Sequence, residues 1–258
     1  MDTTANPYEQ FYLHKEMLSL VMPAYNEGTH IYDNLLRTSR TLAVFASNYE
    51  IIIVDDGSTD NTCSEARHAA SDDEHIKVIS YTPNKGKGGA IREGVMQTSG
   101  EYIGFCDSDL DLDPAQLRGF LYELEEQDAD IAIGSKLHPD SRLDYPKIRR
   151  VMSYGYYVLL KLLFHLNTHD TQTGLKLFRG DTIRPIIKHI TTDGYAFDIE
   201  ILATAATKHK KIIELPVEVV FTRDQDDSGS RIRIRDIFRM IMDTFAIHKR
   251  LRHPTHSS

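Results

Sequence analysis

The sequence has little cysteine and no long apolar run. Its two cysteines, Cys63 and Cys106, lie far apart, which argues against a disulfide framework or a cysteine-rich zinc site. The most apolar stretch, residues 151–166, is interrupted by Lys161 and His165 and is shorter than the roughly 20 residues that span a bilayer. The chain does not open with the basic segment and apolar core of a signal peptide. We therefore expect a cytoplasmic protein that does not cross the membrane.

Charge is unevenly spread along the chain. The net charge is −8 over 258 residues, yet the segment from Arg231 onward holds seven Lys and Arg against two Asp. This segment carries +5, so the first 230 residues carry −13. An acidic body argues against non-specific nucleic-acid binding. A basic tail could contact an anionic membrane or a phosphate group.

Short apolar runs alternate with helical patterns in the first half of the chain. We predict strands at 18–23, 49–54, 76–79, 102–106 and 131–133, and helices at 27–45, 59–70, 88–98 and 114–127. This alternation predicts an α/β fold with a mostly parallel sheet and helices on both faces. The carboxyl ends of the strands would then share one edge, where such sheets bind their ligands.

The second half is patterned differently. We predict a helix at 148–166, a polar turn at 169–174, a strand at 175–178, a strand at 212–221 that is broken at Pro216, and helices at 197–206 and 236–250. The helix at 236–250 is amphipathic and basic. We divide the chain into a lead-in at 1–17, a main domain at 18–230 and a basic C-terminal segment at 231–258.

Three carboxylates follow the predicted strand at 102–106. Alternation would put Asp107, Asp109 and Asp111 on one side if the chain stayed extended. Like charges so close repel one another, which favours an oxygen-preferring divalent cation such as Mg²⁺ or Mn²⁺ that also binds phosphates. The alternative is a solvated acidic loop.

Three further motifs follow predicted strands. Pro23–Glu27 opens a strand–helix turn, where an aromatic ring could stack on a base and a helix N-terminus favours anions. Asp55 and Asp56 end the second strand, where a carboxylate could accept a hydrogen bond from a base; Asp60 is expected to cap the next helix. The glycine-rich segment 84–90 could cradle a phosphate, although it lacks the P-loop spacing.

In their order along the chain, these segments resemble those of the family 2 glycosyltransferases, which have the GT-A fold. Within this family, the chain most resembles the subgroup of dolichyl-phosphate and polyprenyl-phosphate sugar synthases. The matching segments lie between residues 18 and 250, at 23–27, 55–60, 84–90, 107–109, 134–136, 170–174 and 197–200. The resemblance implies a mixed, mostly parallel sheet flanked by helices, with helical and amphipathic elements at the C-terminal end.

The resemblance also implies roles for individual residues on the donor side. Asp107 would lie near the ribose or sugar of the donor, and Asp109, helped by Asp111, would ligate Mg²⁺ or Mn²⁺ at the diphosphate. The remaining nucleotide-sugar contacts would be Pro23, Ala24, Tyr25, Glu27, Asp55 or Asp56, Lys85, Gly86 and Lys87.

On the acceptor side, the resemblance implies a cluster of cations. Lys136 stands where an arginine is common and supplies a cation without its bidentate fork. Arg149 and Ser153, four residues apart on one helix face, would meet an acceptor phosphate together with Arg231. Asp170 and Gln172 could orient the acceptor or sugar. The alternatives are a solvated helix start for Arg149 and an Asx turn for Asp170.

The implied reaction inverts the anomeric carbon as a nucleotide diphosphate leaves. A lipid phosphate acceptor is already ionised near neutral pH and needs no strong base, whereas a hydroxyl acceptor would need one, with Asp170 as the candidate. Segments 84–90 and 170–176 look more like those of dolichyl-phosphate glucosyltransferases than of mannosyltransferases. The resemblance therefore favours UDP-glucose over GDP-mannose as donor.

Partners and competing functions follow from the same residues. The helices at 154–166 and 236–250 could lie on the cytoplasmic face of a membrane, pack on the sheet or form a homodimer. Alternatives are a transferase of the same fold that acts on a glycan, protein or small molecule, and a non-catalytic nucleotide-sugar binder. A nucleotidylyltransferase would need a glycine-rich loop where this chain has Pro23–Glu27.

Overall fold

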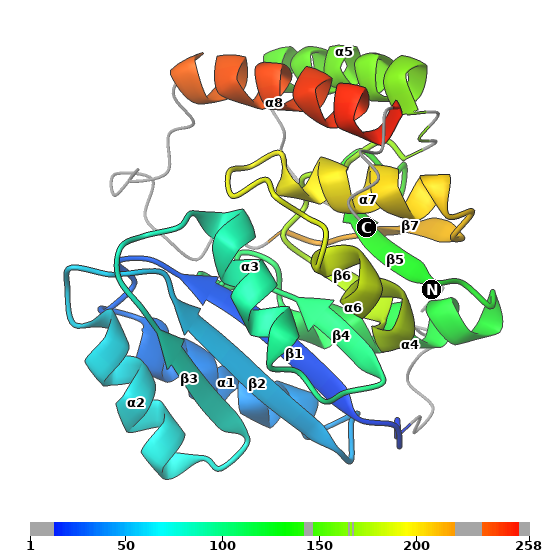
Figure 1. Cartoon of the computed structure of the whole chain (residues 1–258). Coiled ribbons are helices and arrows are strands. Elements are labelled where there is room, and N and C mark those ends of the chain that lie inside the picture. The colour runs from blue at the N-terminus through cyan, green and yellow to red at the C-terminus, as the bar shows by residue number, and fades with distance from the viewer. Residues whose placement is uncertain (1–12, 142–146, 165, 167, 220–233, 253–258) are drawn as a thin grey trace.

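The computed structural model describes residues 13–141, 147–164, 166, 168–219 and 234–252, with the backbone alone for 147–154 and 234–238. Its centre is a seven-stranded sheet with the strand order β3-β2-β1-β4-β6-β5-β7 (Figure 1). The strands are β1 Leu18–Ala24, β2 Tyr49–Asp55, β3 Ile76–Ser80, β4 Tyr102–Phe105, β5 Ile131–Ser135, β6 Lys176–Arg179 and β7 Ile212–Pro216. β6 runs antiparallel to both of its neighbours, and the other pairs are parallel. This confirms the mixed, mostly parallel α/β sheet.

Helices cover both faces of the sheet. They are α1 Ile31–Leu42, α2 Thr62–Asp72, α3 Lys87–Met96, α4 Leu117–Glu126, α5 Lys147–Phe164, α6 Gly180–Ile187, α7 Phe197–Thr207 and α8 Ile234–Arg252, with a 3₁₀ turn at Pro114–Gln116. The alternation of β2 explains the two layers. Ile51 and Ile53 pack toward α1, α2 and α4, whereas Ile52 and Val54 pack toward α3, α6 and α7.

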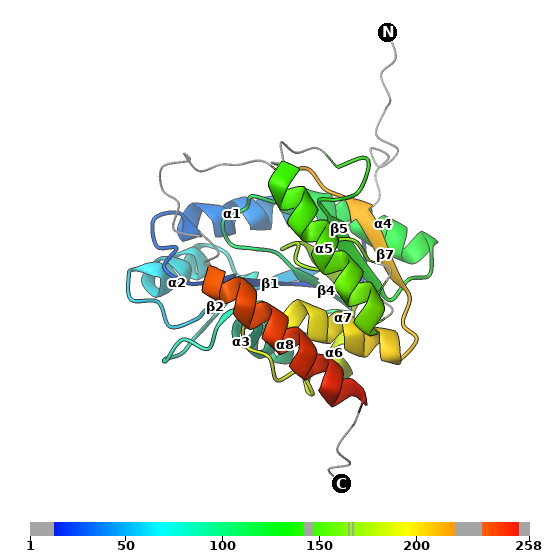
Figure 2. The same cartoon turned by 90° about the horizontal axis from the view of Figure 1, so that it is seen from above.

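Helices α5 and α8 lie side by side above α7, beyond the carboxyl ends of the strands (Figures 1 and 2). Leu160 of α5, Ile199 of α7 and Ile247 of α8 share a small buried cluster. The Tyr156 and Thr244 hydroxyls, 2.8 Å apart, join α5 to α8. The predicted helices at 148–166 and 236–250 therefore form one layer. Within the described ranges, no helix has both the length and the apolar content to cross a bilayer.

One predicted helix begins later than expected, and one helix was not predicted. The first helix begins at Ile31 rather than at residue 27. Before it lies a turn in which Asn26 has a φ of 56°. The backbone N–H groups of this turn donate to Ser58 and Asp60 in the loop after β2 and to Thr62 at the start of α2. Helix α6 was not predicted. It contains Pro185, which normally interrupts a helix, but its buried isoleucines pack against the sheet.

Candidate active site

The predicted donor residues of the first turn lie at the carboxyl end of β1. Pro23 and Ala24 are near the end of the strand, and the side chain of Tyr25 is 48% exposed. The backbone N–H of Glu27 donates to the Thr62 hydroxyl at 2.7 Å, which ties this turn to the start of α2. The turn is therefore fixed while its aromatic ring stays accessible to a ligand.

Asp56 holds the loop that follows β3. Its carboxylate accepts hydrogen bonds from the Tyr81 hydroxyl at 2.8 Å and from the backbone N–H groups of Lys85 at 2.7 Å and Gly86 at 2.8 Å. Burial, and then the bond to Asp56, raises the pKa of the Tyr81 hydroxyl. Asp55 likewise accepts hydrogen bonds from its own turn and from β3. Both carboxylates thus organise loops, and the N–H groups of Lys85 and Gly86 point to Asp56.

The two lysines of the glycine-rich loop point in different directions. The Lys85 ammonium pairs with Glu93 at 2.8 Å and lies over the Tyr81 ring. The Lys87 ammonium pairs with Asp107 at 2.5 Å, across the carboxyl edge of the sheet. Of these two lysines, Lys87 is the one that the loop directs at the acidic motif.

The acidic motif is a turn, so the condition that it stays extended is not met. Leu110 has a φ of 56°, and its N–H donates to the Asp107 carbonyl at 3.3 Å. The N–H of Asp111 donates to the Asp109 carboxylate at 3.2 Å. Asp107 instead packs against Gly174, where an added Cβ would lie 2.1 Å from its carboxylate oxygen.

Asp107 lies in a cluster of alternating charges. Burial alone would raise the pKa of Asp107, but the ammonium groups of Lys87, Lys176 and Lys136 outweigh it and lower that pKa. Lys176 pairs with Asp198 at 2.7 Å, and both side chains are almost fully buried. For Asp198 the effect of burial is larger than the effect of the lysines, so its pKa is raised. The carboxylates and ammonium groups therefore stabilise one another in a site to which water has limited access.

Sequence reasoning assigned no role to Lys176 or Asp198, although both lie in matched or adjacent segments. The sequence does contain a signal for this pair, namely a charged residue in each of two otherwise apolar segments. Lys176 stands within the apolar strand β6, and Asp198 stands in the first turn of α7, where every residue from Phe197 to Ala205 is buried. A charged residue in such a run needs a partner, and here the two partner each other.

The turn after α5 uses Asp170 as a structural acceptor. Its carboxylate accepts from the Lys136 N–H at 3.0 Å, the Gln172 N–H at 3.1 Å and the Thr173 hydroxyl at 2.6 Å. This is the Asx turn that was the alternative interpretation, extended to β5 by the bond to Lys136. It brings Lys136 and the 170–174 turn together beside Asp107.

The remaining predicted acceptor residues cannot be placed as side chains. Arg149 and Ser153 both lie on α5, as expected, but only their backbone is described. Arg231 lies outside the described residues. Their roles stay predictions.

The metal prediction rests on the donor set of the acidic turn. Asp109 and Asp111 are half-buried neighbours that offer carboxylate oxygens, which suit Mg²⁺ or Mn²⁺. The pair fits a cation that takes its other ligands from a diphosphate and water. Among described residues, a three-ligand group within 4.8 Å occurs at the other end of the sheet, formed by His14, Glu16 and Glu125.

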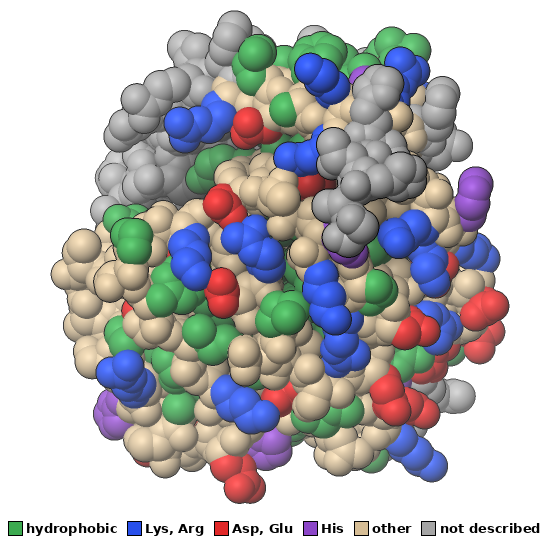
Figure 3. Space-filling view, viewed as in Figure 1, with side chains coloured by type: hydrophobic (Ala, Val, Ile, Leu, Met, Phe, Trp, Pro, Cys, Tyr) green, Lys and Arg blue, Asp and Glu red, His purple; other side chains and the backbone are tan. Residues whose placement is uncertain are grey.

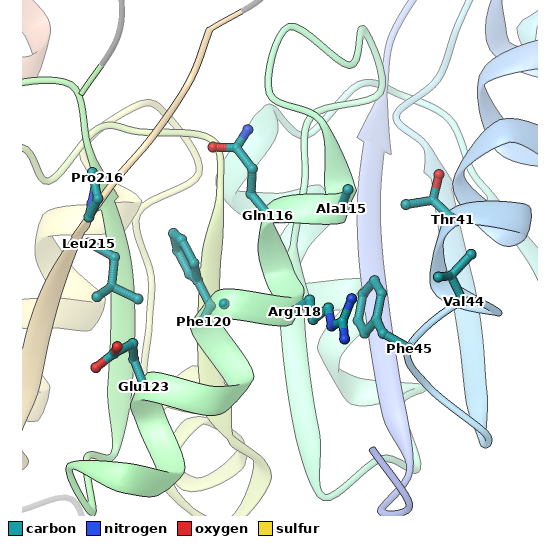
Figure 4. A pocket seen from close by; sticks show the side chains of 11 residues that line it. Thr41, Val44, Phe45, Ala115, Gln116, Arg118, Phe120, Glu123, Leu215 and Pro216 are labelled. Atoms are coloured by element: carbon teal, nitrogen blue, oxygen red, sulfur yellow. The ribbon is translucent and has the colours of Figure 1, made fainter. Parts of the chain in front are cut away.

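A mostly apolar groove of about 520 Å³ lies away from this site (Figure 4). It is formed by the end of α1, the first half of α4 and the end of β7. None of the predicted site residues lines it; the lining includes Val44, Phe45, Phe120, Leu215 and Pro216. The polar carboxyl edge, rather than this groove, gathers the predicted chemistry.

Curated proteins similar to this chain include several enzymes with one name. The dolichyl-phosphate beta-glucosyltransferase of Saccharomyces cerevisiae is 33% identical over 219 residues, which are 78% of this chain and 66% of that protein. The enzyme of the same name from Drosophila melanogaster is 32% identical over 83% of this chain and 69% of that protein. The chain thus spans about two thirds of the length of these relatives.

A solved structure with the same fold is glucosyl-3-phosphoglycerate synthase of Mycobacterium tuberculosis, in complex with Mn²⁺, UDP and glucosyl-3-phosphoglycerate. It superposes with a TM-score of 0.68 at 18% identity, over 93% of this chain and 82% of that chain. This likeness shows the GT-A fold. The family model of glycosyl transferase family 2 matches residues 19–187, which include β1 to β6 and the acidic turn. With its fold, its matched segments and its relatives in agreement, the chain belongs to glycosyl transferase family 2.

Proposed function

We propose that this glycosyltransferase moves glucose from UDP-glucose to the phosphate of a polyprenyl lipid such as dolichyl phosphate, with inversion at the anomeric carbon and with Mg²⁺ or Mn²⁺. The observation that carries this proposal is the gathering of three loops around Asp107. Lys87, the Asp109–Asp111 turn and the 170–174 turn come from separate parts of the chain and meet at one edge. The named activity of the curated relatives supports the choice of sugar and acceptor.

The state of Asp170 favours an acceptor that is already ionised. Both oxygens of this carboxylate accept hydrogen bonds from the turn that they organise. A base so engaged is poorly placed to remove a proton from an acceptor hydroxyl. A phosphate monoester carries an ionised oxygen near neutral pH and needs no such base. This supports a lipid phosphate over a glycan, protein or other hydroxyl acceptor.

The chain's own cations would stabilise the leaving nucleotide. Asp109 and Asp111 would hold the divalent cation, which when bound supplies positive charge to the diphosphate. Lys87 would exchange its contact with Asp107 for the donor, and Lys136 would add a second ammonium. Asp107, released from Lys87, would face the ribose or sugar.

The acceptor would approach from the layer formed by α5 and α8. Arg149 and Ser153, one helical turn apart on α5, would bind its phosphate together with Arg231. Apolar side chains on the two helices are exposed, including Val158, Leu162, Met242 and Phe245, with Leu162 at 72%. The last turn of α8 is basic, and Figure 3 shows Lys and Arg side chains beside hydrophobic ones at the top of the molecule, where Figure 1 places α5 and α8. This combination supports a peripheral position on an anionic membrane surface.

The experiment is a nucleotide-release assay with UDP-glucose or GDP-mannose, in the presence of Mg²⁺ or Mn²⁺, with and without a polyprenyl phosphate. Mass spectrometry of the lipid identifies the product. Lipid-dependent release of UDP and a hexosyl-phosphate lipid are expected. Release of nucleotide from GDP-mannose but not from UDP-glucose would identify GDP-mannose as the donor. If the chain binds the donor but transfers sugar only to a water-soluble acceptor, the proposal of a lipid acceptor would be wrong.

A further inference from the structure

Glu200 joins the C-terminal helix to a turn next to the active site. It lies in the first turn of α7, and its side chain is 3% exposed. One carboxylate oxygen accepts from Arg250 of α8 at 2.6 Å. The other accepts from the backbone N–H groups of Thr191 at 3.2 Å and Thr192 at 2.9 Å. Glu200 therefore fixes the 190–194 turn, and Arg250 supplies the charge that balances it.

The 190–194 turn is interlocked with the loop that carries Lys87. The N–H of Gly88 donates to the Asp193 carbonyl at 2.8 Å, and Arg92 pairs with the Asp193 carboxylate at 2.7 Å. A Cβ at Gly86 would lie 2.6 Å from the Asp193 carbonyl oxygen. The glycines of this loop thus permit close packing against protein backbone, and a shift of the turn must move the loop.

On the side of α8, the described residues do not fill all the space beside the turn. A cavity of about 230 Å³ lies there, lined by Thr191–Gly194 and by Asp243, Ala246 and Arg250. Neighbouring side chains therefore leave room for the turn to shift once the ion pair is lost. Removal of Arg250 would also leave the buried Glu200 carboxylate without its cation, which is costly in a dry environment.

We propose that Arg250 and Glu200 are positioning residues, through which α8 sets the place of Lys87 beside Asp107. The contacts run from Arg250 to Glu200, to the 190–194 turn and to the Lys87 loop. The consequence for turnover rests on the proposed function, but the contacts themselves do not. Since Lys87 is the lysine of its loop that faces the acidic motif, the main effect falls on binding of the donor nucleotide.

The test compares Arg250→Met with Arg252→Met. Arg252 is exposed on the same helix, so both variants lose one positive charge from α8. Arg250→Met is expected to raise the Kd for UDP with Mn²⁺ and the KM for the donor about tenfold, with a smaller change in kcat. Arg252→Met should stay within about twofold of the unchanged chain in both. Arg250→Lys, which keeps the charge, should recover part of the loss.

Amide hydrogen exchange without any ligand gives a second readout. The amides of Gly88, Thr191 and Thr192 should exchange about tenfold faster in Arg250→Met than in Arg252→Met. Glu200→Gln should resemble Arg250→Met, and the double variant should be no worse than either single one. Equal exchange in the two arginine variants would overturn the inference, whatever the enzyme transfers. Arg250-dependent exchange in a chain that shows no lipid-dependent turnover would instead overturn the proposed function alone.

Discussion

The two ends of the sheet each hold a charged network around buried carboxylates, and the two networks are built differently. At the amino end, Glu50 of β2 accepts from the Ser19 hydroxyl, from the N–H and hydroxyl of Ser99 and from the ammonium of Lys77, all between 2.6 and 2.8 Å. At the carboxyl end, Asp107 and Asp198 are held mainly by lysines.

The directions of the pKa shifts express this difference. Burial works against the charge of Glu50, but four hydrogen-bond donors outweigh it and lower its pKa to about 2. Burial of Asp198 prevails and raises its pKa. Donors at the amino end belong largely to strands and turns of the sheet, whereas Lys87, the lysine that contacts Asp107, is the first residue of α3, and its side chain could exchange Asp107 for a ligand. One end stabilises the fold, and the other remains open to chemistry.

Among the variants that test the difference between the two ends of the sheet, Asp109→Ala should have the largest effect. We expect a loss of metal-dependent turnover of about 10³-fold, because this carboxylate is the proposed ligand of the cation at the diphosphate. The unfolding free energy should change by no more than about 1 kcal/mol, because the half-buried carboxylate accepts a backbone hydrogen bond from Asp111. Nucleotide release and denaturant unfolding measure the two effects.

Asp113→Ala is the matched control for that variant. Asp113 is an acid four residues further on, but it caps the 3₁₀ turn at Ala115 and pairs with Arg37 at 2.8 Å. Its removal should cost about 1 kcal/mol of stability and leave metal-dependent turnover nearly unchanged. If Asp109→Ala kept its activity, the assignment of the metal ligands would be wrong.

Glu50→Gln tests the amino end. The folded pKa of Glu50, about 2, lies below the ordinary value of 4.5, so the charge stabilises the fold above pH 4.5 and this contribution is lost as the pH falls toward 2. We expect the variant to lose up to about 3 kcal/mol at pH 7, and the difference to shrink between pH 4.5 and 2. Unfolding in urea across this range measures it.

The same variant should bind the donor normally. Glu50 is near the start of strand β2, at the end of the sheet opposite Asp107, so the Kd for UDP with Mn²⁺ should remain within about twofold where the chain is folded. A large loss of nucleotide affinity at pH 7 would mean that the two ends of the sheet are not separable.

Sequence patterns anticipated the amino-terminal half well, and physical reasons explain where they failed. β1, β2 and β3 are short apolar runs with turn residues after them, so local signals agree with the tertiary structure. The antiparallel insertion of β6 between β4 and β5 depends on pairing across long separations, which periodicity does not report. α6 was missed because its proline is a local stop signal that packing overrides.

For the candidate site, the sequence predicted which loops come together but not how their charged side chains pair. The position of each motif after a predicted parallel strand predicted that their loops meet at one edge, and the contact of Lys87 with Asp107 agrees with this. The pairing of Lys176 with Asp198 joins a strand to a helix and depends on three-dimensional packing. The turn at Leu110 also escaped prediction, because a positive φ at leucine has no local sequence signal.

Apart from the Asp113 control, the smallest expected effects come from two glycines, one at each end of the sheet, and neither has a positive φ. At Gly100 an added Cβ would lie 2.6 Å from the Met17 carbonyl oxygen and 2.7 Å from the Ser19 nitrogen, which are backbone atoms that cannot easily give way. Gly100→Ala should therefore cost about 2 kcal/mol of stability and leave the donor KM of the folded fraction unchanged.

At Gly174 the Cβ would instead meet the carboxylate of Asp107, a side chain that can rotate away. Gly174→Ala should keep its unfolding free energy within about 1 kcal/mol and lose about tenfold in kcat/KM, because Asp107 leaves its place beside Lys87. Steady-state kinetics and urea unfolding of both alanine variants measure these quantities. If Gly174→Ala lost stability and kept its activity, Asp107 would belong with Glu50 as a support of the fold, and the distinction between the two ends would fail at the residue on which it depends most.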